Sequence, residues 1–128
     1  SIPIYDSHAH LISDDLDRYP QHPVVLDFKK IPKGSPFGPG VIGSPGGLHG
    51  LNPVNLKPTA EQLHSWMKEE NVVGIAAVQK GLIYRTDNSY IVDAANLFPE
   101  QMIAVIIVDP TEEKTLPMIR DLSTRAVS

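Results

Sequence analysis

Two short apolar runs with a helical pattern between them constrain the fold of this chain most. Val72–Val78 and Met102–Val108 contain no charged residue, which is typical of strands buried on both faces of a parallel sheet. A helix is expected between them, because Asp87 or Asn88 can cap its start and Pro99 helps to end it. Its expected buried residues recur at helical spacing and are Ile91, Ala94, Ala95 and Phe98. Parallel strands joined by helices indicate an α/β chain with right-handed crossovers.

A second helix is expected before the first of these strands. Thr59-Ala60-Glu61-Gln62 is a capping box, in which the Thr59 hydroxyl can bond the Gln62 amide and the Gln62 side chain can reach back. Three apolar residues at helical spacing are expected to form its buried stripe: Leu63, Trp66 and Met67. Three charged residues are expected to be left mostly to water: Lys68, Glu69 and Glu70.

A third helix is expected near the end of the sequence. Thr111 can cap it, although Pro117 in its first turns indicates a start nearer Leu116. Its expected buried side carries Leu116, Ile119 and Leu122. Residues 125–128 (Arg-Ala-Val-Ser) are typical of the first residues of a fourth strand. We therefore expect the sheet to be part of something larger, with a small open sheet as the alternative.

The first strand is expected to carry alternating polar residues. Asp6, His8 and His10 follow the apolar residues Ile4 and Tyr5. Strand alternation places both imidazoles on one face, with Cβ atoms about 6.6 Å apart, and two rings angled inward can hold one ion at about 2.1 Å from each nitrogen. Asp6 is expected to point the same way, although it can equally cap or orient the strand end. The alternative is a chance pair satisfied by water or backbone carbonyls.

The segment from residue 13 to about residue 58 is expected to be irregular. Between Ile31 and Pro58 it is dense in proline and glycine, which argues against helix and against a central strand. Ordered loops of this length are uncommon and usually functional. Its apolar residues favour a lid or pocket wall over a flexible linker: Phe37, Val41, Ile42, Leu48 and Leu51.

Composition excludes several classes of function. The chain has 128 residues, is 41% hydrophobic and carries a net charge of −4. Because it has no excess of positive charge, binding to nucleic acid or to an anionic membrane is not expected. Small molecules or other subunits, including a homo-oligomer, are the expected partners. The absence of cysteine excludes disulfides, thiolate zinc sites and a cysteine nucleophile, and fits a cytoplasmic location. The run 102–108 is far shorter than the roughly 20 residues of a membrane span, and no export signal is evident.

The order of these motifs resembles the N-terminal part of a metal-dependent, amidohydrolase-related (β/α)8 hydrolase, closest to the branch that holds pyrone-dicarboxylate lactonase. The matching pieces are Asp6–Leu11, Tyr19-Pro20, Pro58–Leu63, Val78-Gln79, Thr86–Tyr90 and Ala104–Pro110. The resemblance implies that residues 1–128 form the N-terminal portion of a single TIM-like (β/α)8 barrel domain, with a Pro/Gly-rich loop at about 13–58. The later strands of this family carry further histidine ligands and a catalytic aspartate, so no catalytic residue is assigned here.

The resemblance also assigns site residues. His8 and His10 become ligands of a divalent metal, with zinc expected first, or, in metal-free lactonases, polar groups that hold the substrate carbonyl. Active sites of this fold lie at the C-terminal mouth of the barrel. There Gln79 can hydrogen-bond substrate, and Tyr84 and Arg85 can hold a substrate carboxylate. The alternatives are a strand-end polar residue without a ligand and a solvated loop charge.

Three functions remain open at this point. The first is a hydrolase that opens a lactone or a related cyclic ester or amide, with a metal assisting the attack of water on the carbonyl. The others are a decarboxylase of the same superfamily and a non-enzymatic small domain with an incidental histidine pair. Lactonase-like spacing and Asp87-Asn88 favour the hydrolase. Asp109 is expected to serve in a turn, and no metal role is expected for His22, His49 or His64.

Overall fold

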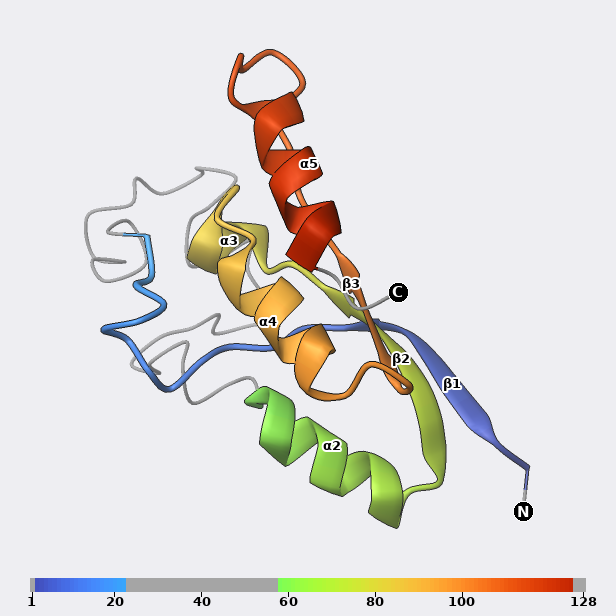
Figure 1. The fold of residues 1–128 in the computed structure, drawn as a ribbon. Helices are drawn as coiled ribbons and strands as arrows, with labels where there is room; N and C mark the ends of the chain where they lie inside the picture. The colour runs from blue at the N-terminus through green and yellow to red at the C-terminus, as the bar shows by residue number, and fades with distance from the viewer. Residues whose placement is uncertain (1, 23–57, 126–128) are drawn as a thin grey trace, which may run out of the picture.

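The computed structural model describes residues 2–22 and 58–125. Three parallel strands form one sheet in the order β1-β2-β3 (Figure 1). The strands are β1 (Ile4–Ala9), β2 (Val72–Val78) and β3 (Met102–Val105), and the helices are α2 (Ala60–Glu69), α3 (Gly81–Tyr84), α4 (Ser89–Leu97) and α5 (Thr115–Arg125). Consecutive strands pair in parallel, with helices in the connections, which confirms the predicted α/β class.

The central strand, β2, covers the predicted residues and pairs with both of its neighbours. The third strand, β3, ends at Val105, so the prediction that it continues to Val108 is wrong. Beyond its end, the Asn88 side chain donates a hydrogen bond to the Ile107 carbonyl (2.8 Å) and accepts one from the Ile107 N–H (3.0 Å). The backbone there bonds a side chain instead of a neighbouring strand, which is why the ladder stops.

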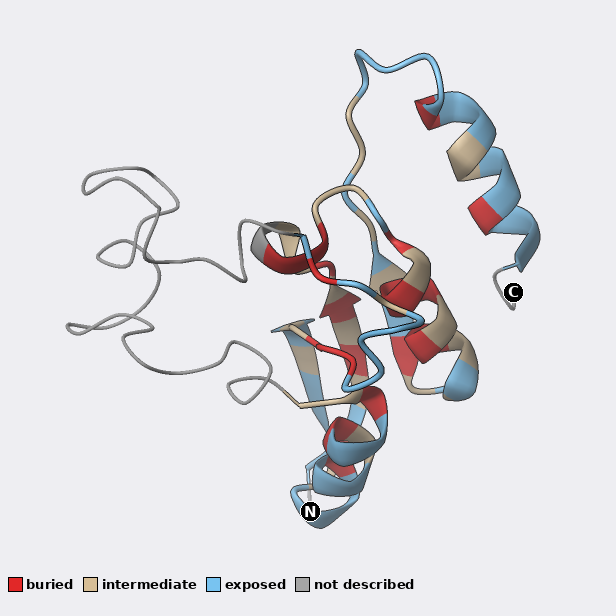
Figure 2. Cartoon of the chain, turned by 90° about the vertical axis from the view of Figure 1, so that its left-hand side faces the viewer, coloured by how far each residue is buried: buried red, intermediate tan, exposed pale blue. Residues whose placement is uncertain are grey.

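Helices α2 and α4 pack against one side of the sheet (Figure 1), and most buried residues lie between these layers (Figure 2). The core takes residues from strands and helices alike, including Ile75, Ala77, Met102, Leu63, Met67, Ile91 and Ala94. Val73 and Ile103 remain exposed, Ile103 by 65%. The prediction of strands buried on both faces is therefore wrong for the described residues, because α2 and α4 cover one side of the sheet.

The predicted capping box starts α2. Thr59 Oγ1 accepts a hydrogen bond from the Gln62 N–H (3.2 Å), and Gln62 Oε1 accepts one from the Thr59 N–H (3.0 Å). Leu63 and Met67 are buried as predicted, whereas Trp66 is 44% exposed. Trp66 lies at the margin of the apolar stripe, so its predicted burial is wrong.

Helix α4 starts at Ser89, directly after the predicted cap residues. Asp87 Oδ1 accepts the Ser89 N–H (3.1 Å), whereas the Asn88 side chain makes no cap bond. The predicted apolar positions Ile91, Ala94 and Ala95 are buried. Phe98 follows the helix and is half-buried, and its ring stacks on that of His64 with a centroid distance of 3.8 Å.

Helix α5 begins one residue before Leu116, close to the later of the two predicted starts. Leu116 is 64% exposed, so its predicted burial is wrong. The helix meets the core through Met118 and Leu122 instead. Arg125 lies in the last turn of α5 and not in the predicted fourth strand, and residues 126–128 lie outside the described residues.

Residues 13–22 contain turns without helix or strand, as predicted for the start of the irregular segment. The lid or pocket wall predicted within residues 23–57 lies outside the described residues. Within the described ranges, no helix combines the length and the apolar character that crossing a membrane requires.

The two ends of this segment meet beside the sheet. The Ile12 N–H donates a hydrogen bond to the Pro58 carbonyl at 3.0 Å. Two tyrosine hydroxyls accept further backbone N–H groups, Tyr84 from Ser13 (2.9 Å) and Tyr90 from Ala60 (3.0 Å). Burial raises the pKa of the Tyr90 hydroxyl to about 12.

Candidate functional site

His8 and His10 lie side by side at the carboxyl end of β1. Their rings are nearly perpendicular (89°), with centroids 4.7 Å apart, and their Nε2 atoms are 3.2 Å apart. His10 Nδ1 lies 2.8 Å from the carbonyl oxygen of Val78, the last residue of β2. The pair therefore spans the ends of two neighbouring strands, at the edge of the sheet where the site was predicted.

The hydrogen-bond partners assign the proton positions of this pair. A carbonyl only accepts, so neutral His10 carries its proton on Nδ1 and directs the lone pair of Nε2 toward His8. His8 then donates its Nε2–H to His10. Metal-binding histidines are commonly oriented in this way, with the second ring nitrogen bonded to a backbone carbonyl.

The spacing of the two Nε2 atoms suits a shared ion. Two nitrogen ligands at about 2.1 Å from a tetrahedral zinc stand about 3.4 Å apart, and these atoms are separated by 3.2 Å. Among the described residues, no cluster of three His, Cys, Asp or Glu side chains is arranged to hold a metal. The pair thus fits two of the four ligands of a zinc site.

Asp6 does not extend the pair as a third ligand. In β1, Asp6 pairs with Ile75 and Ala9 pairs with Ala77, so the register is irregular between them. Such a bulge interrupts the alternation on which the sequence prediction relied. The Asp6 carboxylate accepts the backbone N–H of His8 at 2.9 Å. This contact matches the alternative foreseen for Asp6, the orientation of the strand end.

Both imidazoles line an open recess of ≈ 380 Å³ beside β1. The other lining residues come from β1, from α2 and from the residue before the α2 cap, and are Asp6, Ala9, Pro58, Gln62, Leu63 and Trp66. Gln62 and Trp66 were not among the predicted site residues. The sequence marks them as a helix cap and a buried residue, and only the tertiary arrangement brings them to the imidazoles.

Gln79 follows β2 at the same edge of the sheet and is 2% exposed. Its Nε2 donates to the carbonyls of Arg85 (3.2 Å) and Asp87 (2.6 Å). Both N–H groups of the side chain are therefore used by the backbone of the following loop. Substrate binding by Gln79 stays a prediction.

Tyr84 and Arg85 belong to this same loop. Tyr84 is buried at the end of α3, and burial raises the pKa of its hydroxyl. Arg85 has φ 54° and ψ −122°, and the Asp87 N–H bonds the Tyr84 carbonyl at 2.9 Å. These angles and this bond define a type II′ turn with Arg85 as its second residue. The structure thus brings Gln79, Tyr84 and Arg85 together, and their contact with substrate stays a prediction.

Asn88 holds the other end of this loop and is also 2% exposed. Its Nδ2 donates to the carbonyls of Thr86 (3.1 Å) and Ile107 (2.8 Å), and its Oδ1 accepts the Ile107 N–H. The sequence marks Asn88 as a possible helix cap and as part of the Asp87-Asn88 pair that favours the hydrolase, and neither indicates these bonds. Its link to the segment after β3 joins residues 19 positions apart, which local sequence patterns do not reveal.

Asp109 forms the predicted turn after β3. Its Oδ1 accepts the Thr111 N–H (2.8 Å) and the Thr111 hydroxyl (2.6 Å). These hydrogen bonds hold the pKa of the Asp109 carboxyl below its ordinary value. The predicted structural role of Asp109 is thereby confirmed.

His49, for which no metal role was predicted, lies outside the described residues.

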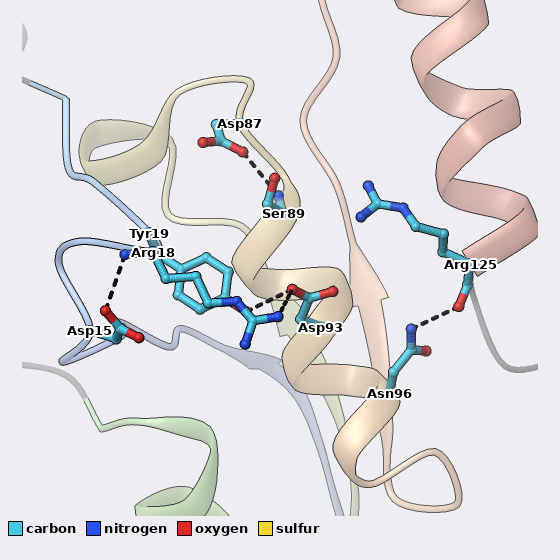
Figure 3. A network of polar contacts seen from close by, with 8 residues as sticks. All are labelled: Asp15, Arg18, Tyr19, Asp87, Ser89, Asp93, Asn96 and Arg125. Carbon is cyan, nitrogen blue, oxygen red and sulfur yellow. Dashed lines mark hydrogen bonds and ion pairs between the residues drawn. The ribbon is translucent and has the colours of Figure 1, made fainter.

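A second polar cluster surrounds α4 (Figure 3). The Tyr19 hydroxyl donates to Asp93 Oδ2 (2.6 Å), and the Arg18 guanidinium lies 3.6 Å from the same oxygen. Burial, followed by this hydrogen bond, raises the pKa of Tyr19 to about 12. The Asn96 side chain donates to the Arg125 carbonyl of α5 at 2.8 Å. These contacts fasten the turns after β1, and also α5, to α4.

Comparison with known proteins supports the fold. No family model matches this sequence, and no curated protein matches it. The chain is similar to the crystal structure of a probable 2-pyrone-4,6-dicarboxylic acid hydrolase from Acinetobacter baumannii with citric acid bound, at 16% identity and a TM-score of 0.58. The match covers 98% of this chain but 36% of that one, so this chain spans about a third of that protein's length. The likeness is one of fold, with parallel βα units arranged as in part of a (β/α)8 barrel.

Proposed function

We propose that the protein is an amidohydrolase-related hydrolase that opens a lactone or a related cyclic ester or amide. The observation that carries this proposal is the His8–His10 pair, with Nε2 atoms 3.2 Å apart at the carboxyl edge of the sheet. Barrel enzymes hold their active sites at that edge. The same pair would serve a decarboxylase, but the similar structure belongs to a probable hydrolase, which favours hydrolysis.

His8 and His10 would hold a divalent cation, with zinc as the first candidate. When bound, such an ion polarises the scissile carbonyl and lowers the pKa of its water toward about 7. In a metal-free enzyme, the Nε2–H of His8 donates to the substrate carbonyl. His10, held by Val78, then offers its Nε2 as the acceptor that orients water. In either form, Val78 fixes the direction of the His10 ring.

We further infer a carboxylate on the substrate, bound by Arg85 in the loop after β2. Guanidinium binds carboxylate through paired hydrogen bonds, which a neutral side chain cannot match. The dicarboxylic acid in the name of the similar protein, and the citric acid in its crystal, support an acidic ligand. Citrate is therefore a suitable probe of this loop. We also propose that the protein acts on small molecules in the cytoplasm, as a monomer or homo-oligomer.

The test is hydrolysis of 2-pyrone-4,6-dicarboxylate by the full native protein and by His8→Ala and His10→Ala variants. Each substitution should lower turnover by about 100-fold or more, because a positioned proton donor or acceptor contributes that much. His22→Ala removes an exposed imidazole elsewhere and should leave turnover unchanged. Full activity in both pair variants would contradict the proposal. Zinc content before and after each substitution separates the metal-bound form from the metal-free one.

A further inference from the structure

The loop after β2 contains an arginine in a conformation that favours glycine. Arg85 has φ 54° and ψ −122°, the second position of a type II′ turn, where a side chain crowds the backbone. Among the described non-glycine residues, only Asn71 shares a positive φ, at 57°. Asparagine tolerates this region well, and a long side chain does not. The strain at Arg85 is therefore specific to this turn.

A buried side chain holds the strained turn in place. Gln79 Nε2 donates to the carbonyl of Arg85 and to that of Asp87, at 3.2 and 2.6 Å, and so fastens two residues of the turn. The carbonyl of the preceding residue, Val78, orients the ring of His10 at 2.8 Å. Two consecutive residues at the end of β2 thus connect the imidazole pair to the strained turn.

We propose that Gln79 is a positioning residue, which keeps Arg85 in its strained turn so that the guanidinium can bind a carboxylate of the substrate. The identity of the ligand rests on the proposed function. Strained backbone persists where the surrounding structure enforces it, and it concentrates at ligand sites. An arginine at a position that favours glycine destabilises the loop. A binding role for its guanidinium accounts for an arginine at this position despite the loss of stability. In this role Gln79 acts through Arg85.

The first experiment measures thermal unfolding and citrate affinity of Arg85→Gly in the full native protein. Glycine relieves the strain, so Tm should rise by about 2–5 °C. Loss of the guanidinium should weaken citrate binding about tenfold or more. Asn71→Gly is the matched control, because Asn71 also has a positive φ but precedes β2, at the opposite end from Gln79; its citrate affinity should not change. A lower Tm or unchanged citrate affinity in Arg85→Gly would overturn the proposal, as would a native protein that binds no citrate.

The second experiment tests the positioning role through coupling. Gln79→Met keeps much of the side-chain volume but removes the two donors, and should weaken citrate binding about fivefold in the native background. In the Arg85→Gly background, where no guanidinium remains to be positioned, it should change citrate affinity less than about twofold. Gln79→Leu, which also lacks the donors, replaces Gln79→Met if that variant does not fold. A Gln79 variant that lowers Tm yet binds citrate with native affinity would show a purely structural role and overturn the proposal.

Citrate binding requires no turnover, so the two proposals fail separately. Arg85-dependent citrate binding without lactone hydrolysis would contradict the proposed function and leave the positioning role standing. The opposite result is also distinct: hydrolysis is lost in the His8 and His10 variants, but citrate affinity is the same with and without Arg85. That result would support the proposed function and contradict the positioning role.

Discussion

The carboxyl end of β1 and the connection after β2 both carry polar side chains at the same edge of the sheet, but the first set is accessible to solvent and the second is buried. His8 is exposed and His10 half-buried, and their rings bond each other. Gln79 and Asn88 are each 2% exposed, and their side chains make two and three hydrogen bonds to backbone groups. A polar residue at a strand end is therefore not enough to identify a ligand-binding group. The two regions differ in whether the polar atoms are buried and already hydrogen-bonded to backbone groups.

This contrast has an energetic basis. A buried backbone group that loses its hydrogen-bond partner carries a desolvation penalty of about 1–3 kcal/mol, whereas an exposed group can bond water instead. Substitution of the buried side chains of Tyr84 and Asn88 should therefore act on stability, and substitution of the exposed His8 should act on chemistry. Four measurements follow, beginning with the largest expected effect, and three of them test this division.

Asn88→Ala should lower the free energy of unfolding by about 3 kcal/mol, because three hydrogen bonds are lost at about 1 kcal/mol each. Urea unfolding at constant m-value measures this change. Asn96→Ala is the matched control, since the Asn96 side chain donates to the Arg125 carbonyl on the exposed side of α4. The contrast between the two regions fails if Asn88→Ala costs no more than Asn96→Ala.

Tyr84→Phe should lower the free energy of unfolding by about 1–2 kcal/mol, because the Ser13 N–H loses its acceptor in a buried setting. The ring and its packing are retained, so the loss isolates the hydroxyl. Tyr5→Phe removes a hydroxyl from an exposed ring and should change stability by less than about 0.3 kcal/mol. Equal effects of the two substitutions in urea unfolding would show that the Tyr84 bond contributes nothing.

Alkaline pH should destabilise the fold through Tyr19 and Tyr90. Burial raises the pKa of each hydroxyl to about 12, against about 10 in an unfolded chain. The folded state therefore holds protons that the unfolded state releases, so this stability is complete below pH 10 and is lost as pH rises toward about 12. Tm measured across this window should fall, and the fall should shrink in Tyr90→Phe. A Tm that stays level while tyrosinate absorbance rises would contradict the assignment.

His8→Ala should change the free energy of unfolding by less than about 0.5 kcal/mol, because its ring is exposed. The same variant should lose turnover, which sets His8 apart from Asn88. Urea unfolding and hydrolysis measured on one preparation make the comparison direct. A stability loss near that of Asn88→Ala would place His8 among the structural residues.

Local sequence patterns predicted much of the fold correctly. The capping box at Thr59, the bounds of β2 and the buried positions of α4 depend on residues close along the chain, so periodicity and capping chemistry reveal them. The predictions that were wrong depend on distant contacts. Trp66 and Leu116 keep the helical spacing of buried residues but meet no core, and β3 stops early because a side chain from another loop takes its backbone groups.

The sequence by itself determined the order of the three strands and of α2, α4 and α5, and it placed two histidines two residues apart at the end of β1, because these patterns depend on residues close along the chain. Only the tertiary structure decided which polar side chains at the sheet edge form hydrogen bonds with backbone groups. His10 bonds a carbonyl 68 residues away, and Asn88 bonds a segment 19 residues away. Hydrogen bonds between groups so far apart leave no periodic trace in the sequence, since they form only when the strands lie side by side.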